Sequence, residues 1–179
     1  EDNVVKEPLI PEGTVLKGSP VKKKVEDAEL GMTEWTLANG AKVVVKHTDF
    51  KADEVRMSAV AKGGLSVLSD GEFYMGEMMP AVNSMSGVGK FPATELKKQL
   101  SGKTASVQPS VENYASAMKG VCSPKDIETM LQLLYLNFTQ PRFDRNDYDN
   151  LIKMLRSQLE NARTNPDYLM QEKVIDVTY

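Results

Sequence analysis

Side chains that could do chemistry are few in this sequence, and their types do not combine into a catalytic group. His47 is the only histidine and Cys122 the only cysteine. A zinc site built on two histidines or on several cysteines is therefore excluded. Ser84, Ser86 and Ser123 have no histidine to activate a hydroxyl, and Cys122 has no evident base.

Glycines and carboxylates give no stronger signal. Gly87-Val88-Gly89 is part of a phosphate-binding pattern, but Pro92 stands where the third glycine is needed. The pair also follows a predicted helix instead of opening one after a strand, so it indicates a helix end and a tight turn. Glu72 and Glu77 have no partner at a spacing typical of acid–base catalysis.

A methionine-rich stretch, Met78-Met79-Pro80-Ala81-Val82-Asn83, falls within a helix expected over about 72–85. Its methionines, with Met75 and Met85, are expected to pack in the core; a soft, adaptable binding surface is the alternative. Pro80 removes a backbone hydrogen bond, which predicts a kink or a late helix start.

The composition describes an ordinary globular protein. Its 179 residues are 41% apolar and 26% charged, enough for one domain with a proper core. The net charge of −3 gives no electrostatic argument for nucleic-acid binding. No apolar run approaches the length of a membrane span.

The ends of the chain predict a fragment of a longer polypeptide. It starts at Glu1 without an initiator methionine or signal peptide and stops at Tyr179 within a helical pattern. Residues 1–30 are polar and proline-containing, so we expect a linker from an upstream domain. Its Lys22-Lys23-Lys24 run is interpreted as solvated, not as a binding patch. Residues 31–179 are expected to form the domain.

The predicted strands are antiparallel. Asn39-Gly40 separates two β-prone runs and predicts a hairpin with a two-residue turn. A third strand, 54–61, alternates apolar Val55, Met57, Ala59 and Ala61 with polar residues. The strand candidates are 33–37, 41–47, 54–61, 103–109 and 113–121.

Helices are predicted around these strands. A short one spans 93–100, and Ser123, Pro124 and Asp126 form a good start for another. Asp144 is expected to cap the last long one. The buried stripes are predicted as Ile127, Met130, Leu131, Leu134 and Phe138, and as Tyr148, Leu151, Ile152, Leu155 and Leu159. This order predicts an α+β fold, an antiparallel-rich sheet with helices packed on one face.

Several runs, taken in order, resemble the M16 (pitrilysin/insulinase-type) peptidase domain. Residues 36–45 match its "LxNGxxV" hairpin, Gly63-Gly64 its "GG", 86–96 its "KGT…P..EL" pattern, and 137–143 its "P.F" turn. Residues 102–110, 119–128 and 159–166 resemble its edge strand, its later strand and helix, and the segment that ends in "NP". The resemblance covers about 33–176 and implies the LuxS/M16 metallopeptidase-like two-layer fold.

Active M16 domains carry H-x-x-E-H, two zinc-binding histidines and a general base. Counting back from Gly87 places these positions at Met78, Ala81 and Val82, and the third ligand falls at or near Gln158, with Glu160 one or two residues away. The resemblance therefore implies no catalytic residue and no metal in this chain, and Zn²⁺ in a catalytic half of the parent protein.

M16 enzymes pair such domains around a peptide. This chain resembles the non-catalytic partner, which implies that it walls the chamber and docks on the catalytic domain of the same polypeptide, without a nucleic acid or membrane span. A peptide substrate is expected to add to the edge strand at Ser106, Val107 and Gln108. The chain looks most like long bacterial M16 proteins of the Bacteroidetes type, which implies a periplasmic or cell-envelope parent.

Two alternatives stay open. One is an M16-like assembly subunit that binds no peptide, and an intact H-x-x-E-H upstream in the parent would argue against it. The other is an unrelated enzyme that uses Cys122 or an unrecognised carboxylate pair.

Overall fold

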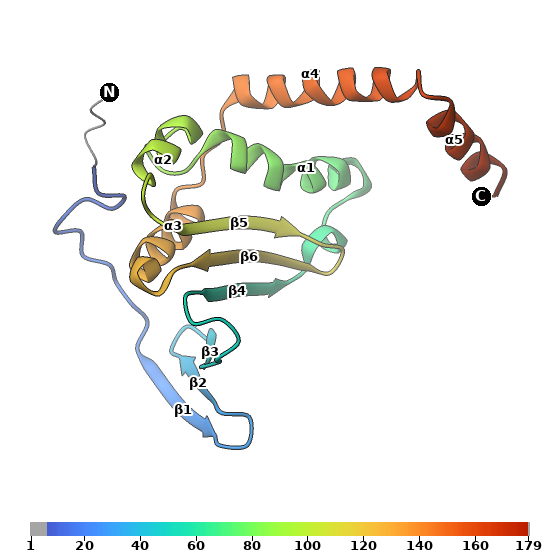
Figure 1. The fold of residues 1–179 in the computed structure, drawn as a ribbon. Helices are drawn as coiled ribbons and strands as arrows, with labels where there is room; N and C mark the ends of the chain where they lie inside the picture. The colour runs from blue at the N-terminus through green and yellow to red at the C-terminus, as the bar shows by residue number, and fades with distance from the viewer. Residues whose placement is uncertain (1–6, 179) are drawn as a thin grey trace.

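Two three-stranded antiparallel sheets and five α-helices make up the computed structural model, which describes residues 7–178 (Figure 1). The first sheet has the order β1-β2-β3, and the second has the order β4-β6-β5. The strands are β1 Val21–Asp27, β2 Met32–Leu37, β3 Lys42–Lys46, β4 Val55–Lys62, β5 Ala105–Val111 and β6 Ala115–Cys122. The helices are α1 Asp70–Ser86, α2 Ala93–Gln99, α3 Ile127–Thr139, α4 Arg145–Ala162 and α5 Pro166–Thr178, with short 3₁₀ turns at Gly64–Val67 and Pro124–Asp126.

The second sheet is covered by helices on one face, as predicted. Helices α1 and α3 both contact β5, and α3 also contacts β6 (Figure 1). Met57 faces this layer: a Cβ at Gly120 would lie 2.8 Å from Met57 Cε and 2.9 Å from Met130 Sδ of α3. Alternate residues on the other face, such as Arg56 and Gln108, are exposed. The alternation of apolar and polar residues in the sequence therefore predicted the buried face of β4 correctly.

A strand lies inside the segment expected to be a linker. β1 pairs with β2 from Val21 to Asp27, and its lysine run is part of that strand. Lysines are common on edge strands, where they oppose pairing with other chains. Because the same polar composition is typical of linkers, the strand was not predicted. Residues 1–6 of the expected linker, like Tyr179 at the other end, lie outside the described residues.

The predicted hairpin between β2 and β3 is present, but its turn differs from the prediction. Leu37 N–H donates to Ala41 O at 2.8 Å, which encloses a loop of three residues, not two. Only Gly40 has a positive φ, of 88°, while Asn39 Oδ1 accepts a hydrogen bond from Ala41 N–H at 3.0 Å. This is the three-residue loop in which glycine occupies the left-handed position.

Helix α1 runs through Pro80 without starting late. It begins at Asp70, where the Glu72 carboxylate accepts from Ser69 N–H at 3.1 Å and from Ser69 Oγ at 2.6 Å. These two hydrogen bonds, both donated by Ser69, stabilise the first turn and fix the helix start. Ser84 Oγ donates to the Pro80 carbonyl at 2.9 Å.

The buried faces of the methionine-rich helix and of α3 differ from the predictions. Met75 and Met79 are 59% and 51% exposed, so they do not pack in the core. In α3, the inward face consists of Thr129, Met130, Leu133, Leu136 and Asn137. Ile127, Leu131 and Phe138, which were predicted to be buried, are 44%, 50% and 61% exposed.

The N-terminal segment contributes to the core. Leu9 is 7% exposed and belongs to a cluster with Val88, Phe91, Leu133 and Leu136. Glu7 N–H donates to Gln99 Oε1 of α2 at 2.9 Å, and the Glu7 carboxylate pairs with Lys90. Residues 7–14, which we call the N-terminal strap, therefore pack on α2 and α3.

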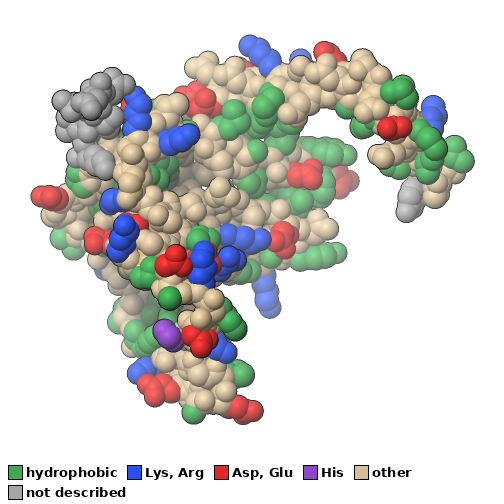
Figure 2. Space-filling model, in the orientation of Figure 1, with side chains coloured by type: hydrophobic (Ala, Val, Ile, Leu, Met, Phe, Trp, Pro, Cys, Tyr) green, Lys and Arg blue, Asp and Glu red, His purple; other side chains and the backbone are tan. Residues whose placement is uncertain are grey.

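The C-terminal helices extend away from the sheets (Figure 1). α4 contacts α1, but Leu151 is its only buried residue, and α5 has none. Leu155 and Leu159, expected to be buried, are 40% and 43% exposed. Apolar side chains gather on this arm in Figure 2, and on α5 they include Leu169, Met170, Val174 and Ile175. No helix among residues 7–178 is long and apolar enough to cross a membrane.

Candidate functional site

The positions expected to correspond to the zinc motif lie on the second half of α1 and carry no suitable ligand. Val82 is 2% exposed, Met78 is half-buried and Ala81 is exposed. Two of these side chains are hydrocarbons, and the thioether of Met78 is a soft ligand that Zn²⁺ does not favour. The residues present do not fit a zinc ion.

The expected third-ligand position is on α4. Gln158 and its neighbour Glu160 are both exposed on that helix. Across residues 7–178, no three His, Cys, Asp or Glu side chains are grouped so that they could hold a metal ion.

The predicted peptide-contact residues lie on the outer strand of the second sheet. β5 pairs with β6 on one side, and no described strand pairs with its other side. Val107 is half-buried and packs against the core cluster, while Ser106 and Gln108 are exposed. The strand therefore combines one inward anchor with two outward polar side chains.

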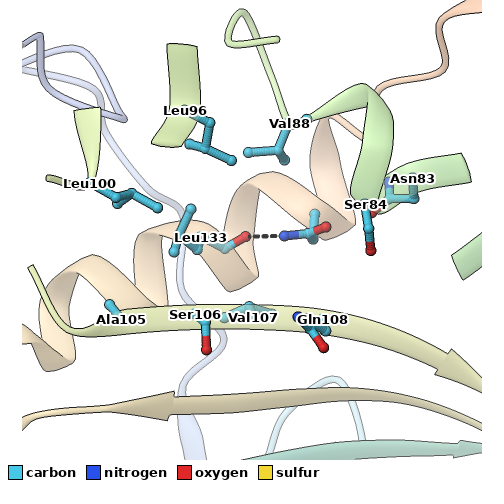
Figure 3. Close-up of a pocket in the computed structure, with 12 residues that line it drawn as sticks. Asn83, Ser84, Val88, Leu96, Leu100, Ala105, Ser106, Val107, Gln108 and Leu133 are labelled. Atoms are coloured by element: carbon cyan, nitrogen blue, oxygen red, sulfur yellow. Dashed lines mark hydrogen bonds between the residues drawn. The ribbon is translucent and has the colours of Figure 1, made fainter. Parts of the chain in front are cut away.

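A groove of about 190 Å³ lies beside this strand. Leu96 of α2 and Leu100, the residue after α2, face Ala105 and Val107 across it, with Leu133 of α3 behind and Ser84 of α1 at one end (Figure 3). The remaining lining residues are Asn83, Gly87, Val88, Ser106, Gln108 and Asn137. Leu96, Leu100 and Leu133 were not predicted as site residues. The i,i+4 spacing of Leu96 and Leu100 was the available signal.

The turn after α1 sets the position of α2 over the groove. Gly87 ends α1 with φ 83°, and a Cβ there would lie 2.2 Å from Phe91 O. Only glycine allows this close approach of two backbone segments. Gly89 N–H then donates to Gln140 O at 3.0 Å, which joins the turn to the end of α3.

Asp126 fixes the start of β5. Its Oδ2 accepts hydrogen bonds from Ser123 Oγ at 2.6 Å and from Thr104 N–H at 2.8 Å. These bonds, led by that from Ser123, lower the pKa of the Asp126 carboxyl below its ordinary value. Ser123 was expected to cap the following helix with its side chain. It instead donates to Asp126, and the pair links β5 to α3.

The only cysteine and the only histidine lie apart from the groove lining. Cys122 is 1% exposed at the end of β6, where burial, and then the charge of Asp126, raises the pKa of its thiol. A buried thiol of this kind is a poor nucleophile. His47 follows β3 and is exposed.

Curated proteins related to the chain are zinc proteases, while no protein-family model matches it. The chain is 26% identical over 160 residues to the zinc protease PQQL-like of Arabidopsis thaliana, covering 89% of this chain and 14% of that protein. It is 25% identical over 103 residues to the probable zinc protease PqqL of Haemophilus influenzae, covering 58% of this chain and 11% of that protein. It thus spans 11–14% of the length of these relatives.

Solved structures share the fold. The periplasmic protease PqqL of Escherichia coli matches with a TM-score of 0.78 and 18% identity, covering 97% of this chain and 19% of that one. The ferredoxin protease FusC, in complex with Arabidopsis ferredoxin, matches with a TM-score of 0.74 and 16% identity, covering 94% and 19%. PqqL and FusC are M16 proteases, so the expected resemblance is confirmed: this chain is similar to M16 domains and has their fold of mixed helices and antiparallel sheet.

Proposed function

We propose that this M16-like domain is a non-catalytic part of a zinc peptidase, in which it walls the peptide chamber and docks on the domain that carries the zinc. The observation that carries the proposal is the chemistry of α1: Met78, Ala81 and Val82, at the positions where the resemblance predicts the zinc motif, do not fit a zinc ion. Zinc proteases among the relatives favour Zn²⁺ in the parent protein. The E. coli PqqL is described as periplasmic, which favours a periplasmic or envelope parent.

Peptide contact in this proposal occurs at β5. An extended peptide pairs readily with an open sheet edge, because main-chain hydrogen bonds supply affinity without a fixed sequence. Ser106, Val107 and Gln108 lie on that edge strand, and the groove lies beside them. The domain would hold a substrate while another domain cleaves it.

Metal analysis tests the non-catalytic role. The purified chain is dialysed with excess Zn²⁺ and then against metal-free buffer, together with a known zinc enzyme. We expect far less than one zinc per chain, because a stable site needs at least three protein ligands. A stoichiometry near one would contradict the proposal.

Kinetics test the contact at β5. In a peptidase that contains this chain and a zinc-bearing M16 domain, Val107→Ala should raise KM by about five-fold or more, with a smaller effect on kcat. Val60→Ala, at a 67% exposed position on β4, is the matched control. An unchanged KM in the Val107 variant favours the alternative of an assembly subunit that binds no peptide.

A further inference from the structure

The groove beside β5 contains no charged residue. Its lining consists of twelve residues, all of them apolar or neutral polar (Figure 3). Val88 and Leu133 are 2% and 3% exposed and form a buried, largely apolar base. The one polar side chain there is Asn137, 7% exposed, whose Nδ2 donates to Leu133 O at 2.9 Å. Ser84, which is exposed, and Asn83, which is half-buried, form a polar rim on the α1 side (Figure 3). A polar rim over an apolar base is typical of a pocket that accepts a hydrocarbon group and keeps water at its mouth.

The size of the groove indicates a side chain and not a small-molecule ligand. Its volume of about 190 Å³ is several times the ~30 Å³ share of a water molecule. Small-molecule and cofactor sites have volumes of about 300–1,000 Å³. A single large side chain matches the observed space better than a cofactor does.

The strand register identifies which peptide residue would enter the groove. Residues opposite each other in paired strands point to the same face of the sheet. Val107 points to the helix-covered face, whereas Ser106 and Gln108 point to the open face. In a peptide paired with β5, the residue opposite Val107 would therefore point toward α2 and α3, and its two neighbours would point to solvent.

We propose that the groove is a selectivity pocket for one uncharged aliphatic side chain, that of the peptide residue opposite Val107. This inference rests on the proposed peptide contact at β5. A lysine or glutamate at that position would lose its water against Leu96, Leu100 and Leu133 and would find no countercharge in the lining. The groove thus excludes charged residues at this position and leaves the neighbouring positions unrestricted.

Binding of guest peptides to this chain tests the inference. The probes are fluorescein-labelled Ser/Thr octapeptides with one central guest residue, either leucine, asparagine, lysine or glutamate. Fluorescence anisotropy should give a Kd for the leucine guest at least about ten-fold lower than for the lysine and glutamate guests, within the range seen for apolar pockets. This series uses the unaltered chain, so it does not depend on any variant folding.

Variants then test whether the difference in Kd between guest peptides arises in the groove. Leu100→Ala should reduce the leucine-to-lysine ratio of Kd values, and the volume-conserving Leu100→Met should preserve it. Leu169→Ala on α5, where the residue is 43% exposed, is the matched control and should leave the ratio unchanged. Equal Kd values for all four guests would overturn the inference but leave the peptide contact intact. If no guest peptide binds, the proposed contact at β5 is wrong, and the inference is overturned with it.

Discussion

Asp126 joins three segments through a single carboxylate oxygen. It accepts from the Ser123 hydroxyl and from the Thr104 backbone, and it is itself 7% exposed. Ser123 N–H also donates to Thr104 O at 2.9 Å, so the start of β5 is held at two points. Because β5 forms one wall of the groove, this carboxylate positions the candidate site without facing it.

Replacing Asp126 should make the free energy of unfolding less sensitive to pH in the acidic range. The carboxyl pKa is lowered in the folded chain, so its stabilising effect is complete above the unfolded value of about 4 and is lost as pH falls through the folded value. Asp126→Asn should therefore lower the free energy of unfolding at pH 7, and the gap should narrow below about pH 4. Urea unfolding at pH 7, 4 and 3 measures this gap. A gap that stays constant over this range would contradict the role given to the carboxylate.

Cys122 should be inert in the folded chain. Its thiol is 1% exposed and its pKa is raised by burial, so little thiolate exists at neutral pH. We expect a disulfide reagent to modify Cys122 at least about a hundred-fold more slowly in buffer than in urea, because reaction requires local unfolding. Fast modification in buffer would revive the alternative in which this cysteine acts as a nucleophile.

At the scale of elements, the connection from α1 to α2 depends on Gly87. A methyl group there would meet the carbonyl oxygen of Phe91, and φ is positive. Gly87→Ala should lower the free energy of unfolding by about 1–3 kcal/mol. Gly18→Ala, where a Cβ would meet nothing within 4 Å, is the matched control. Thermal unfolding followed by circular dichroism compares the two, and equal shifts would contradict the strained backbone.

Elements governed by local contacts were predictable from the sequence. Asp144 was expected to cap α4, and its Oδ1 accepts from Asn146 N–H at 2.9 Å. The hairpin around Asn39-Gly40 formed as expected, although with a longer turn. Caps and hairpins involve residues a few positions apart, so their signals survive in a single sequence.

Elements decided by distant contacts were not predictable. Helix α3 has apolar residues around much of its surface, and the sheet and the N-terminal strap select the face with Met130, Leu133 and Leu136. The groove was missed for the same reason, since it combines residues from α1, α2, α3 and β5. β5 itself was expected as the edge strand because of the family resemblance, and the topology places it at a sheet edge.

At the scale of the whole molecule, the N-terminal strap is part of the folded domain. Leu9→Ala should lower the free energy of unfolding by about 2 kcal/mol or more, since it removes a buried side chain from the main cluster. Val15→Ala, at a 92% exposed position, should change it by less than about 0.5 kcal/mol. Chemical denaturation measures both. Similar small effects would mean that the strap does not pack on α2 and α3 in solution.

The register of the second sheet has a consequence for the order of folding. β5 and β6 are adjacent in sequence and form a hairpin, whereas β4 pairs with β6 from Val55↔Cys122 to Lys62↔Ala115 and encloses α1, α2 and β5. Closing that long loop costs chain entropy before the contacts between β4 and β6 can offset it. We expect the β5–β6 hairpin and α3 to associate early and β4 to join late. The groove wall would then form before the sheet is complete, and the edge at β5 would be exposed to other chains throughout folding.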